Sequence, residues 1–266
     1  MVSQSSFQRS SIAYNNSLER MATGSRINRA SDDPAGLISS DQLASALAAL
    51  EAESRSMDRA DSVASTADGA LAEMSSLLSD ANAATVAMAN TAGMSQAERD
   101  SYQLEIDSAM QAVDRIASTA TFNGQKLFDG SMTLSVGGAS FSIAGVSLGS
   151  LGESSGHSLA EVQSGGSASP STNPEAAQSS LSAAISTIAT MRGQIGSFQS
   201  TSLEPMQRAN GAAIANSAAA YSAIRDTDYA AESSTLSRAS FMRQANMMVL
   251  GLANSSQGAA LNLIAG

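Results

Sequence analysis

The sequence lacks cysteine and tryptophan altogether, and aromatic side chains make up only 4% of its residues. Without cysteine, disulfide bonds and thiolate metal sites are excluded. The hydrophobic residues, 43% of the chain, are therefore mostly Ala, Leu, Ile, Val and Met. Such small or flexible side chains suit long, closely packed helices better than they suit a thick globular core.

Positive charge is also scarce. The chain has 14 basic and 24 acidic residues, a formal net charge of −10, and Lys126 is its only lysine. Because no run of basic residues occurs, neither nucleic acid nor an anionic membrane surface is expected as a partner. No apolar run is long enough to span a membrane. Residues 1–9 lack the apolar core of a secretory signal, so composition alone indicates a cytosolic protein.

The strongest positive signal is a heptad repeat that runs from Leu43 to Met88, with twelve of its fourteen core positions apolar. A stripe of this length predicts one long helix that packs along a partner helix. The first core position holds Leu43, Leu50, Met57, Ala64, Leu71, Leu78 and Thr85, and the second holds Ala46, Glu53, Ala60, Ala67, Met74, Ala81 and Met88.

Local signals predict the elements in the middle of the chain. Ser95 and Glu98 have the spacing of a capping box, which predicts a helix that ends near Asn123-Gly124. Apolar residues alternate with polar ones on both sides of Gly137-Gly138, which predicts a β-hairpin within residues 131–148. Val146 and Leu148 are candidates for a further strand.

The second half of the chain returns to helical patterns. Residues 149–174 are rich in Gly and Ser and are expected to form an exposed loop or the remnant of an outer domain. Asn173 and Pro174 then open a helix, which Pro205 must kink or interrupt. The last segment, residues 229–264, is apolar on more than one side, and the chain has too little other material to cover it. We expect neighbouring copies of the molecule to cover it.

These patterns together predict a mainly α fold. The N- and C-terminal regions are expected to form a long antiparallel helical bundle or coiled coil, in which early helices pair with late ones. A small β-hairpin unit is expected beside it, and no large outer domain.

Residues 17–36, SLERMATGSRINRASDDPAG, resemble the N-terminal signature of bacterial flagellins. Further matches to the same family follow in the right order, up to the C-terminal region that also defines it. They lie at residues 68–71, 121–127, 224–230, 236–239, 244–246, 249–250 and 253–254.

The resemblance implies a structural subunit, with no catalysis and no cofactor, that polymerises into the bacterial flagellar filament for motility. An inner domain would combine residues 1–27 with 230–266, and an outer helical domain would comprise residues 28–229, including the hairpin near 131–148 and the loop 149–174. Flagellins are exported unfolded by the flagellar type III system, so the protein would be secreted into the extracellular flagellum. Expected partners are further copies of the chain, an export chaperone at the C-terminal helix, and the filament cap and hook-junction proteins.

Two groups of residues are candidates for contacts between subunits. In the family, the loop that joins the two domains touches neighbouring subunits, which makes Arg26, Asn28, Asp32 and Asp33 candidates. The second group lies on the apolar lines of the C-terminal segment and comprises Leu236, Ala239, Phe241, Met242, Val249, Leu250, Leu263 and Ile264.

Two places in the sequence also admit a chemical interpretation. Asp32 and Asp33 would suit a pair of catalytic carboxylates or a cation site, but a helix cap ahead of Pro34 explains them better. His157, the only histidine, lies among serines, yet a Ser-His-acid site needs a rigid scaffold that a Gly/Ser loop does not provide. We interpret His157 as a solvated loop residue.

Two departures of the sequence from the family pattern bear on its function. The segment before Leu18 is shorter than the family norm, so part of the C-terminal helix is expected to lack its usual mate. Residues 79–86 lack the arginine and acidic cluster that Toll-like receptor 5 reads in many flagellins, so weak or absent recognition is expected. The alternative functions are a hook–filament junction protein, which shares these helices, and, less favoured, a secreted helical adhesin or effector.

Replacing an apolar residue of the C-terminal segment should separate folding from polymerisation. We expect Leu236→Asp to retain folded central helices, seen by circular dichroism, but to form no filaments under the electron microscope. Filaments of normal length from this variant would contradict the expectation.

Overall fold

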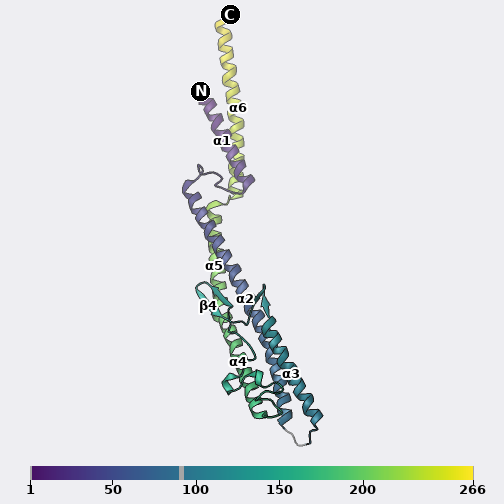
Figure 1. Cartoon of the computed structure of the whole chain (residues 1–266). Coiled ribbons are helices and arrows are strands. Elements are labelled where there is room, and N and C mark those ends of the chain that lie inside the picture. The colour runs from purple at the N-terminus through teal and green to yellow at the C-terminus, as the bar shows by residue number, and fades with distance from the viewer. Residues whose placement is uncertain (1, 90–92, 266) are drawn as a thin grey trace. The chain divides into compact units, whose positions relative to one another are not determined.

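The computed structural model describes residues 2–89 and 93–265, with side chains described for residues 3–89 and 93–256. Its helices are α1 (Val2–Thr23), α2 (Pro34–Ala89), α3 (Gln96–Thr119), α4 (Pro174–Phe198), α5 (Glu204–Arg225) and α6 (Tyr229–Ala265). The short strands β1 (Thr121–Phe122) and β2 (Gln125–Lys126) form one hairpin, and β3 (Thr133–Val136) and β4 (Ala139–Ser142) form another. The predicted mainly α fold with a small β unit is confirmed (Figure 1).

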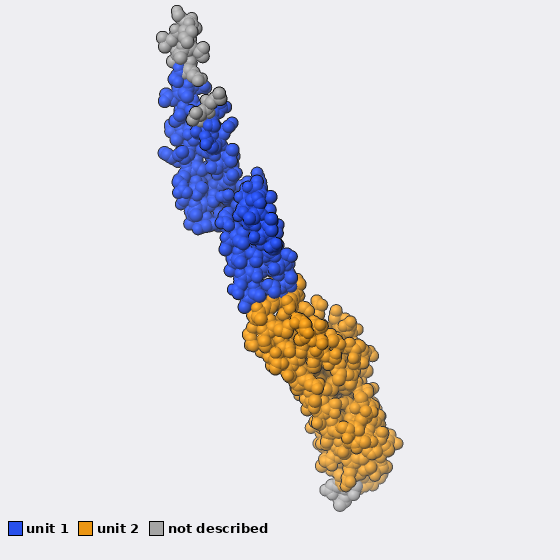
Figure 2. Space-filling model, turned by 90° about the vertical axis from the view of Figure 1, so that its left-hand side faces the viewer, with its two compact units in different colours: residues 1–50, 212–266 blue, residues 51–211 orange. Residues whose placement is uncertain are grey.

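The chain divides into two compact units, which Figure 2 shows in different colours. Unit 1 comprises residues 1–50 and 212–266, and unit 2 comprises residues 51–211. Helices α2 and α5 contribute residues to both units. The family implies other domain boundaries, at 27/28 and 229/230, which lie close to the non-helical segments before α2 and α6. These boundaries remain a prediction.

Unit 2 contains the hydrophobic core. From Met57 to Met88, every position of the predicted heptad stripe on α2 is buried. Nearer the start of α2, in unit 1, Leu43 and Leu50 are only partly buried and Ala46 is exposed. The heptad pattern therefore predicted the long helix correctly. Its apolar stripe is fully buried only in the part of α2 that belongs to unit 2.

Polar contacts along α2 fix its direction relative to the late helices. Asp68 accepts a hydrogen bond from Arg192 Nε at 2.8 Å, and Asp61 accepts one from Gln199 Nε2 at 2.9 Å. Farther toward the start of α2, Gln207 Nε2 donates to Asp58 at 3.4 Å. Because residue numbers fall on α2 as they rise on the partner, the two segments are antiparallel, as predicted.

The cap and turn predictions in the middle of the chain are also confirmed. Ser95 and Glu98 form a reciprocal capping box at the start of α3, and the hydrogen bonds from Ser95 to the Glu98 carboxylate lower the pKa of that group. Gly137 and Gly138 form the two-residue loop between β3 and β4, with φ of 55° and 84°. Positive φ at both positions is typical of a type I′ turn, which glycine adopts without strain.

Val146 and Leu148 do not form a further strand, contrary to the sequence-based expectation. The Val146 amide donates to the carbonyl oxygen of Phe128 at 2.9 Å, and its side chain is buried in the core of unit 2. The apolar residues here therefore alternate because they anchor a connecting segment to the core. Alternation over so short a run does not distinguish the two cases.

Residues 149–174 form a loop, as expected, but the expectation that it is exposed holds for only part of it. This segment contains two 3₁₀ turns, η1 (Glu153–Ser155) and η2 (Leu159–Glu161), and it packs against α4. Its backbone polar groups pair locally, for example Leu159 N–H with Leu151 O at 2.8 Å, which permits burial. Its apolar residues Leu151, Leu159, Val162 and Ala168 belong to the core.

The start of α4 and the interruption of the helix near Pro205 lie where the sequence predicted them. Asn173 caps α4, because its side-chain oxygen accepts a hydrogen bond from the Ala176 amide at 3.2 Å, and Pro174 is the first helical residue. Between α4 and α5, residues 199–203 form a π-helical segment, η3 (Gln199–Leu203), just before Pro205. The wider turn lets the helical path continue past a proline, which would otherwise clash with the preceding turn.

The core of unit 2 should account for most of the stability of the free chain. Leu78 is fully buried, so we expect Leu78→Ala to lower the free energy of unfolding by about 2–5 kcal/mol in urea titrations followed by circular dichroism. The adjacent Ser79 is exposed, and Ser79→Ala is expected to change it by less than about 0.5 kcal/mol. Equal losses from the two variants would show that this stripe is not the core.

Candidate assembly surface

Helices α1 and α6 lie side by side in unit 1, although they come from opposite ends of the sequence (Figure 1). The loops that adjoin them are joined by a short antiparallel bridge between Ser25 and Asp226. In it, Arg26 N–H donates to Arg225 O at 2.6 Å and Thr227 N–H donates to Gly24 O at 2.9 Å. The pairing of the two terminal regions, predicted from the sequence, is thus confirmed within unit 1.

The face of α6 that meets α1 is only partly apolar. Ala239 is buried and Leu236 and Leu250 are partly buried on it, but Arg243 and Asn246 lie on the same face. On α1 the buried residue is Ser17, whose hydroxyl donates to the carbonyl oxygen of Glu232 at 3.4 Å, and serines recur among the partly buried positions. The terminal pair therefore buries little apolar surface along its seam.

The opposite face of α6 is apolar and exposed. At 3.6 residues per turn, Phe241, Met248 and Leu252 lie on the side away from Ala239 and Leu250. Met242, Met247 and Val249 lie on the two flanks of that side. The exposed fractions are 68% for Phe241, 53% for Met242, 48% for Met247, 72% for Met248, 53% for Val249 and 72% for Leu252. We call these six residues the outer apolar surface of α6.

The two units differ sharply in how they place hydrophobic side chains. Among the described residues, unit 2 holds thirty-five buried hydrophobic residues in one cluster, whereas unit 1 holds two, Ile27 and Ala239. Conversely, ten of the twelve exposed large hydrophobic residues belong to unit 1. Contiguous exposed apolar surface of this kind marks a site of contact with other macromolecules.

The structure divides the C-terminal candidates into two sets. Leu236, Ala239 and Leu250 face α1, while Phe241, Met242 and Val249 lie on the outer apolar surface. The sequence had placed Leu236, Ala239, Met242 and Val249 on one line, which the structure separates because α1 covers only one side of α6. The side chains of the remaining candidates, Leu263 and Ile264, lie outside the described residues.

Met247, Met248 and Leu252 were missing from the candidates, although all three are exposed and Met248 and Leu252 are the most exposed of the large apolar side chains described on α6. The signal that points to Met248 and Leu252 was present, since they continue a second apolar line from Phe241 through Ala245. Met247 lies beside that line and has no comparable pattern in the sequence.

The loop candidates are engaged in contacts within the chain. The Arg26 guanidinium donates to the carbonyl oxygen of Ile224 at 2.6 Å, and Asn28 Nδ2 donates to Ser25 O at 2.9 Å. The first bond holds the loop between α1 and α2 against the end of α5, and the second lies within the loop. The Arg26 side chain is nevertheless exposed, so it can also reach another molecule.

Asp33 caps α2, as the sequence indicated, whereas Asp32 stabilises the turn before it. Asp33 Oδ1 accepts a hydrogen bond from the Gly36 amide at 2.8 Å, directly before α2 begins at Pro34. Asp32 Oδ2 accepts from the amides of Arg29 at 2.9 Å and Asn28 at 3.1 Å, and these bonds lower the pKa of Asp32. Both carboxylates thus satisfy backbone amides of this turn.

His157 is half-buried and paired, which corrects its interpretation as a solvated residue. Its Nδ1 lies 2.8 Å from Glu161 Oε2, and Ser167 donates to the same carboxylate oxygen. The Ser167 hydroxyl and then His157 lower the pKa of Glu161 to about 2. The histidine therefore ties the segment between the hairpin and α4 together, and among the described residues no serine hydroxyl bonds to its Nε2, where a Ser-His-acid site needs the nucleophile.

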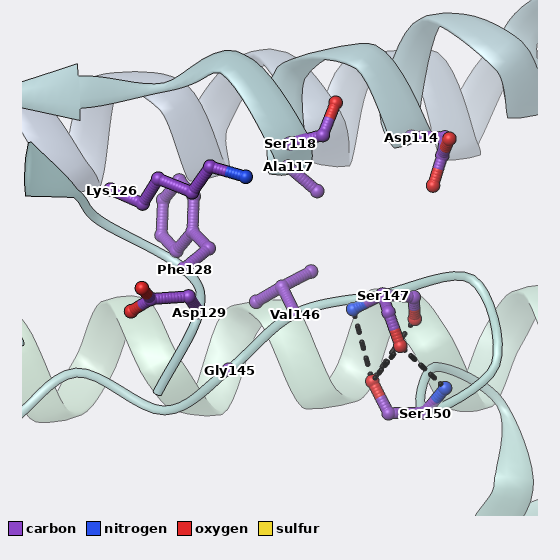
Figure 3. Close-up of a pocket in the computed structure, with 10 residues that line it drawn as sticks. All are labelled: Asp114, Ala117, Ser118, Lys126, Phe128, Asp129, Gly145, Val146, Ser147 and Ser150. Atoms are coloured by element: carbon purple, nitrogen blue, oxygen red, sulfur yellow. Dashed lines mark hydrogen bonds between the residues drawn. The ribbon is translucent and has the colours of Figure 1, made fainter. Parts of the chain in front are cut away.

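A cavity of about 440 Å³ in unit 2 is lined by Lys126, Phe128 and the Ser147–Ser150 turn (Figure 3). The hydroxyls of Ser147 and Ser150 bond to each other at 3.0 Å, so they are committed to the local turn. Among the side chains described, no group of three acidic or histidine residues could hold a metal ion. Nor is any helix in the described ranges long and apolar enough to cross a membrane.

These features define a class of protein: a helical subunit with one unit that folds around its own core and another whose apolar surface is left for other molecules. Comparison with known proteins gives the family. The model of the bacterial flagellin N-terminal helical region matches residues 1–133, and that of the bacterial flagellin C-terminal helical region matches residues 179–264. The chain belongs to the bacterial flagellin family, whose members are structural filament proteins and not enzymes.

Individual relatives agree with this assignment. A flagellin of Halalkalibacterium halodurans is 28% identical over 250 residues, which is 93% of this chain and 90% of that protein. The flagellar filament 30.7 kDa core protein of Treponema maltophilum is 29% identical over 93% of this chain and 90% of its own length. The B-type flagellin of Pseudomonas aeruginosa is 35% identical over 54% of this chain, but the match spans only 30% of that protein.

Proposed function

We propose that this chain is a subunit of the extracellular flagellar filament and that polymerisation completes the folding of unit 1. The outer apolar surface of α6 carries this proposal, because nothing in the described part of unit 1 covers it. In a filament, neighbouring copies supply the missing cover. Free subunits then hold their terminal helices only weakly, and the helices become ordered against the neighbours.

The energy available is adequate for this mechanism. Full burial of one large apolar side chain contributes about 1.5–3 kcal/mol. Six such side chains, each roughly half to three-quarters exposed in the free chain, therefore offer several kcal/mol per subunit when neighbours cover them. Ordering of the terminal helices offsets part of this gain. Because the contacts repeat in every subunit, the polymer is stable although each contact is modest.

The distribution of charge also supports unit 1 as the part of the chain that packs against other copies. Unit 1 has seven basic and seven acidic residues and is formally neutral, whereas unit 2 has seven basic and seventeen acidic residues. The whole net charge of −10 therefore lies in unit 2. Dense packing of many copies of unit 1 meets no net charge repulsion, while the acidic unit 2 favours solubility of the subunit before assembly.

Finer contacts are part of the proposal. We assign Phe241, Met242 and Val249 to the subunit interface, together with Leu263 and Ile264. Leu236, Ala239 and Leu250 support it by holding α1 against α6. At the loop, the exposed side chains of Arg26 and Asp32 are the best placed to reach a neighbour, and Asn28 and Asp33 maintain the loop conformation.

The route to the filament follows from family membership. We propose export of the unfolded chain through the flagellar type III apparatus, with a chaperone on the C-terminal helix and contacts to the cap and hook-junction proteins. The outer apolar surface of α6 suits a chaperone, because it needs cover before assembly as well as after it. The absence of cysteine suits export, because no cross-link can hold the chain folded.

A substitution on the outer surface tests the proposal more directly than one in the seam. We expect Met248→Asp to abolish filaments, since a carboxylate would be buried at the interface without a partner. The matched variant Met248→Leu keeps an apolar side chain of similar volume and is expected to assemble like the parent chain. Assembly is measured by sedimentation and electron microscopy after addition of salt, and folding of unit 2 by circular dichroism. Normal filaments from Met248→Asp would rule out this surface as the interface.

We further propose weak recognition by Toll-like receptor 5. Residues 79–86 offer Ser79, Asp80, Ala83 and Val86 as their exposed side chains, without an arginine. In a dose-response on cells bearing the receptor, the half-maximal concentration is expected to lie at least roughly 100-fold above that of a potent flagellin, a loss of about 2.7 kcal/mol. Equal potency of the two proteins would refute this proposal.

A further inference from the structure

The seam between α1 and α6 contains polar contacts at positions where a coiled coil ordinarily has apolar residues. The guanidinium carbon of Arg243 lies 4.0 Å from the centre of the Tyr14 ring, a cation–π contact. Three residues farther on, Asn246 Nδ2 donates to Ser6 O at 3.3 Å and to Ser10 Oγ at 3.2 Å. These contacts lie within the part of α6 whose outer surface is apolar.

A third contact lies near the other end of the seam. Arg20 Nη1 is 3.9 Å from Glu232 Oε2, and the Glu232 side chain is only 13% exposed. Glu232, Ala239, Arg243, Asn246 and Leu250 follow one another at intervals of three, four or seven residues, so they lie on one stripe of α6. The polar residues therefore occupy positions of the seam itself and not its flanks.

We propose that these three contacts, Arg243 with Tyr14, Asn246 with Ser6 and Ser10, and Glu232 with Arg20, specify the register in which α1 pairs with α6. A polar residue at a core position of a coiled coil costs stability but excludes alternative registers, because in those registers it is buried without a partner. This inference adds to the proposed function: a single register gives every subunit the same outer surface to present to its neighbours.

The sequence of α1 shows why a slipped pairing is disfavoured. If α1 slips by one heptad in one direction, Arg243 meets Phe7 in place of Tyr14 and Asn246 meets Ser3 in place of Ser10, but Glu232 lies opposite Ala13 and loses its cation. If α1 slips in the other direction, Arg243 lies opposite Met21, and Glu232 lies beyond the end of α1 at Thr23. Apolar seam residues do not discriminate in this way, because the apolar positions on α1 are few and serines recur between them.

The register can be measured with spin labels, because the chain has no cysteine of its own. Asn16→Cys on α1 and Ser237→Cys on α6 are both exposed and take one label each. Labelled subunits are assembled with an excess of unlabelled parent chain, and the distance between the labels is measured by pulsed electron paramagnetic resonance. We expect one narrow distance population with the native seam.

The decisive variant makes the seam apolar. Arg243→Leu combined with Asn246→Leu is expected to add a second distance population, with the helices displaced by one heptad, about 10 Å along the axis. One unchanged narrow population would overturn the proposal, because apolar packing alone would then set the register.

A swap separates register from general damage to the helices. Tyr14→Arg and Arg243→Tyr are each expected to broaden the distribution or to keep the subunit out of filaments. The double exchange restores the cation–π pair with the roles reversed, and we expect it to restore the single distance and incorporation. Failure of the exchange to restore either would count against the proposal. If the parent chain itself forms no filaments, the proposed function fails, and the same labels then report the register in the free subunit.

Discussion

Unit 1 has almost no core of its own, and this constraint governs the rest of the molecule. Its two terminal helices meet along a seam of serines, an arginine, an asparagine and a few apolar residues, while its larger apolar side chains point outward. Such a unit is marginal by itself, because the apolar area it buries does not offset the entropy of ordering two helices. On the proposed function it becomes stable when other copies cover it, and folding and assembly are then one process for this part of the chain.

Unit 2, in contrast, buries its apolar residues within the chain itself, although they are of the same few types. Its helices bury a continuous stripe of Ala, Leu and Met, and the hairpin and the segment between β4 and α4 close the cluster. Polar pairs such as Asp68 with Arg192 fix the direction and alignment of the helices at the rim. This unit therefore has a core of its own, whereas we propose that unit 1 needs neighbouring copies to cover its apolar surface.

The sequence predicted the helices well because their signals are local and repeated. The heptad stripe of α2, the capping box of α3 and the Asn173-Pro174 start of α4 were all found where they were expected. The packing of residues 149–174 was not predicted, because their Gly and Ser content hid four core residues spaced too irregularly to give a period. On α6, periodicity showed that too many residues were apolar but not which of them α1 covers. Arg243 and Asn246 lie on the side that α1 covers, but both are polar, so a pattern of apolar residues could not identify that side.

The π-helical segment before Pro205 adjusts the phase of the helix that contains it. Upstream, buried residues of α4 recur at three and four, up to Ile195 and Phe198, but the next buried residue is Leu203, five positions later. One extra residue in a single turn absorbs this mismatch, because an ordinary α-helix would have turned Leu203 away from the core. If the same five residues formed an ordinary α-helical turn instead, the start of α5 would be rotated by about 100° relative to α4. The width of this one turn thus sets which side of the first residues of α5 faces α2, where Gln207 reaches Asp58.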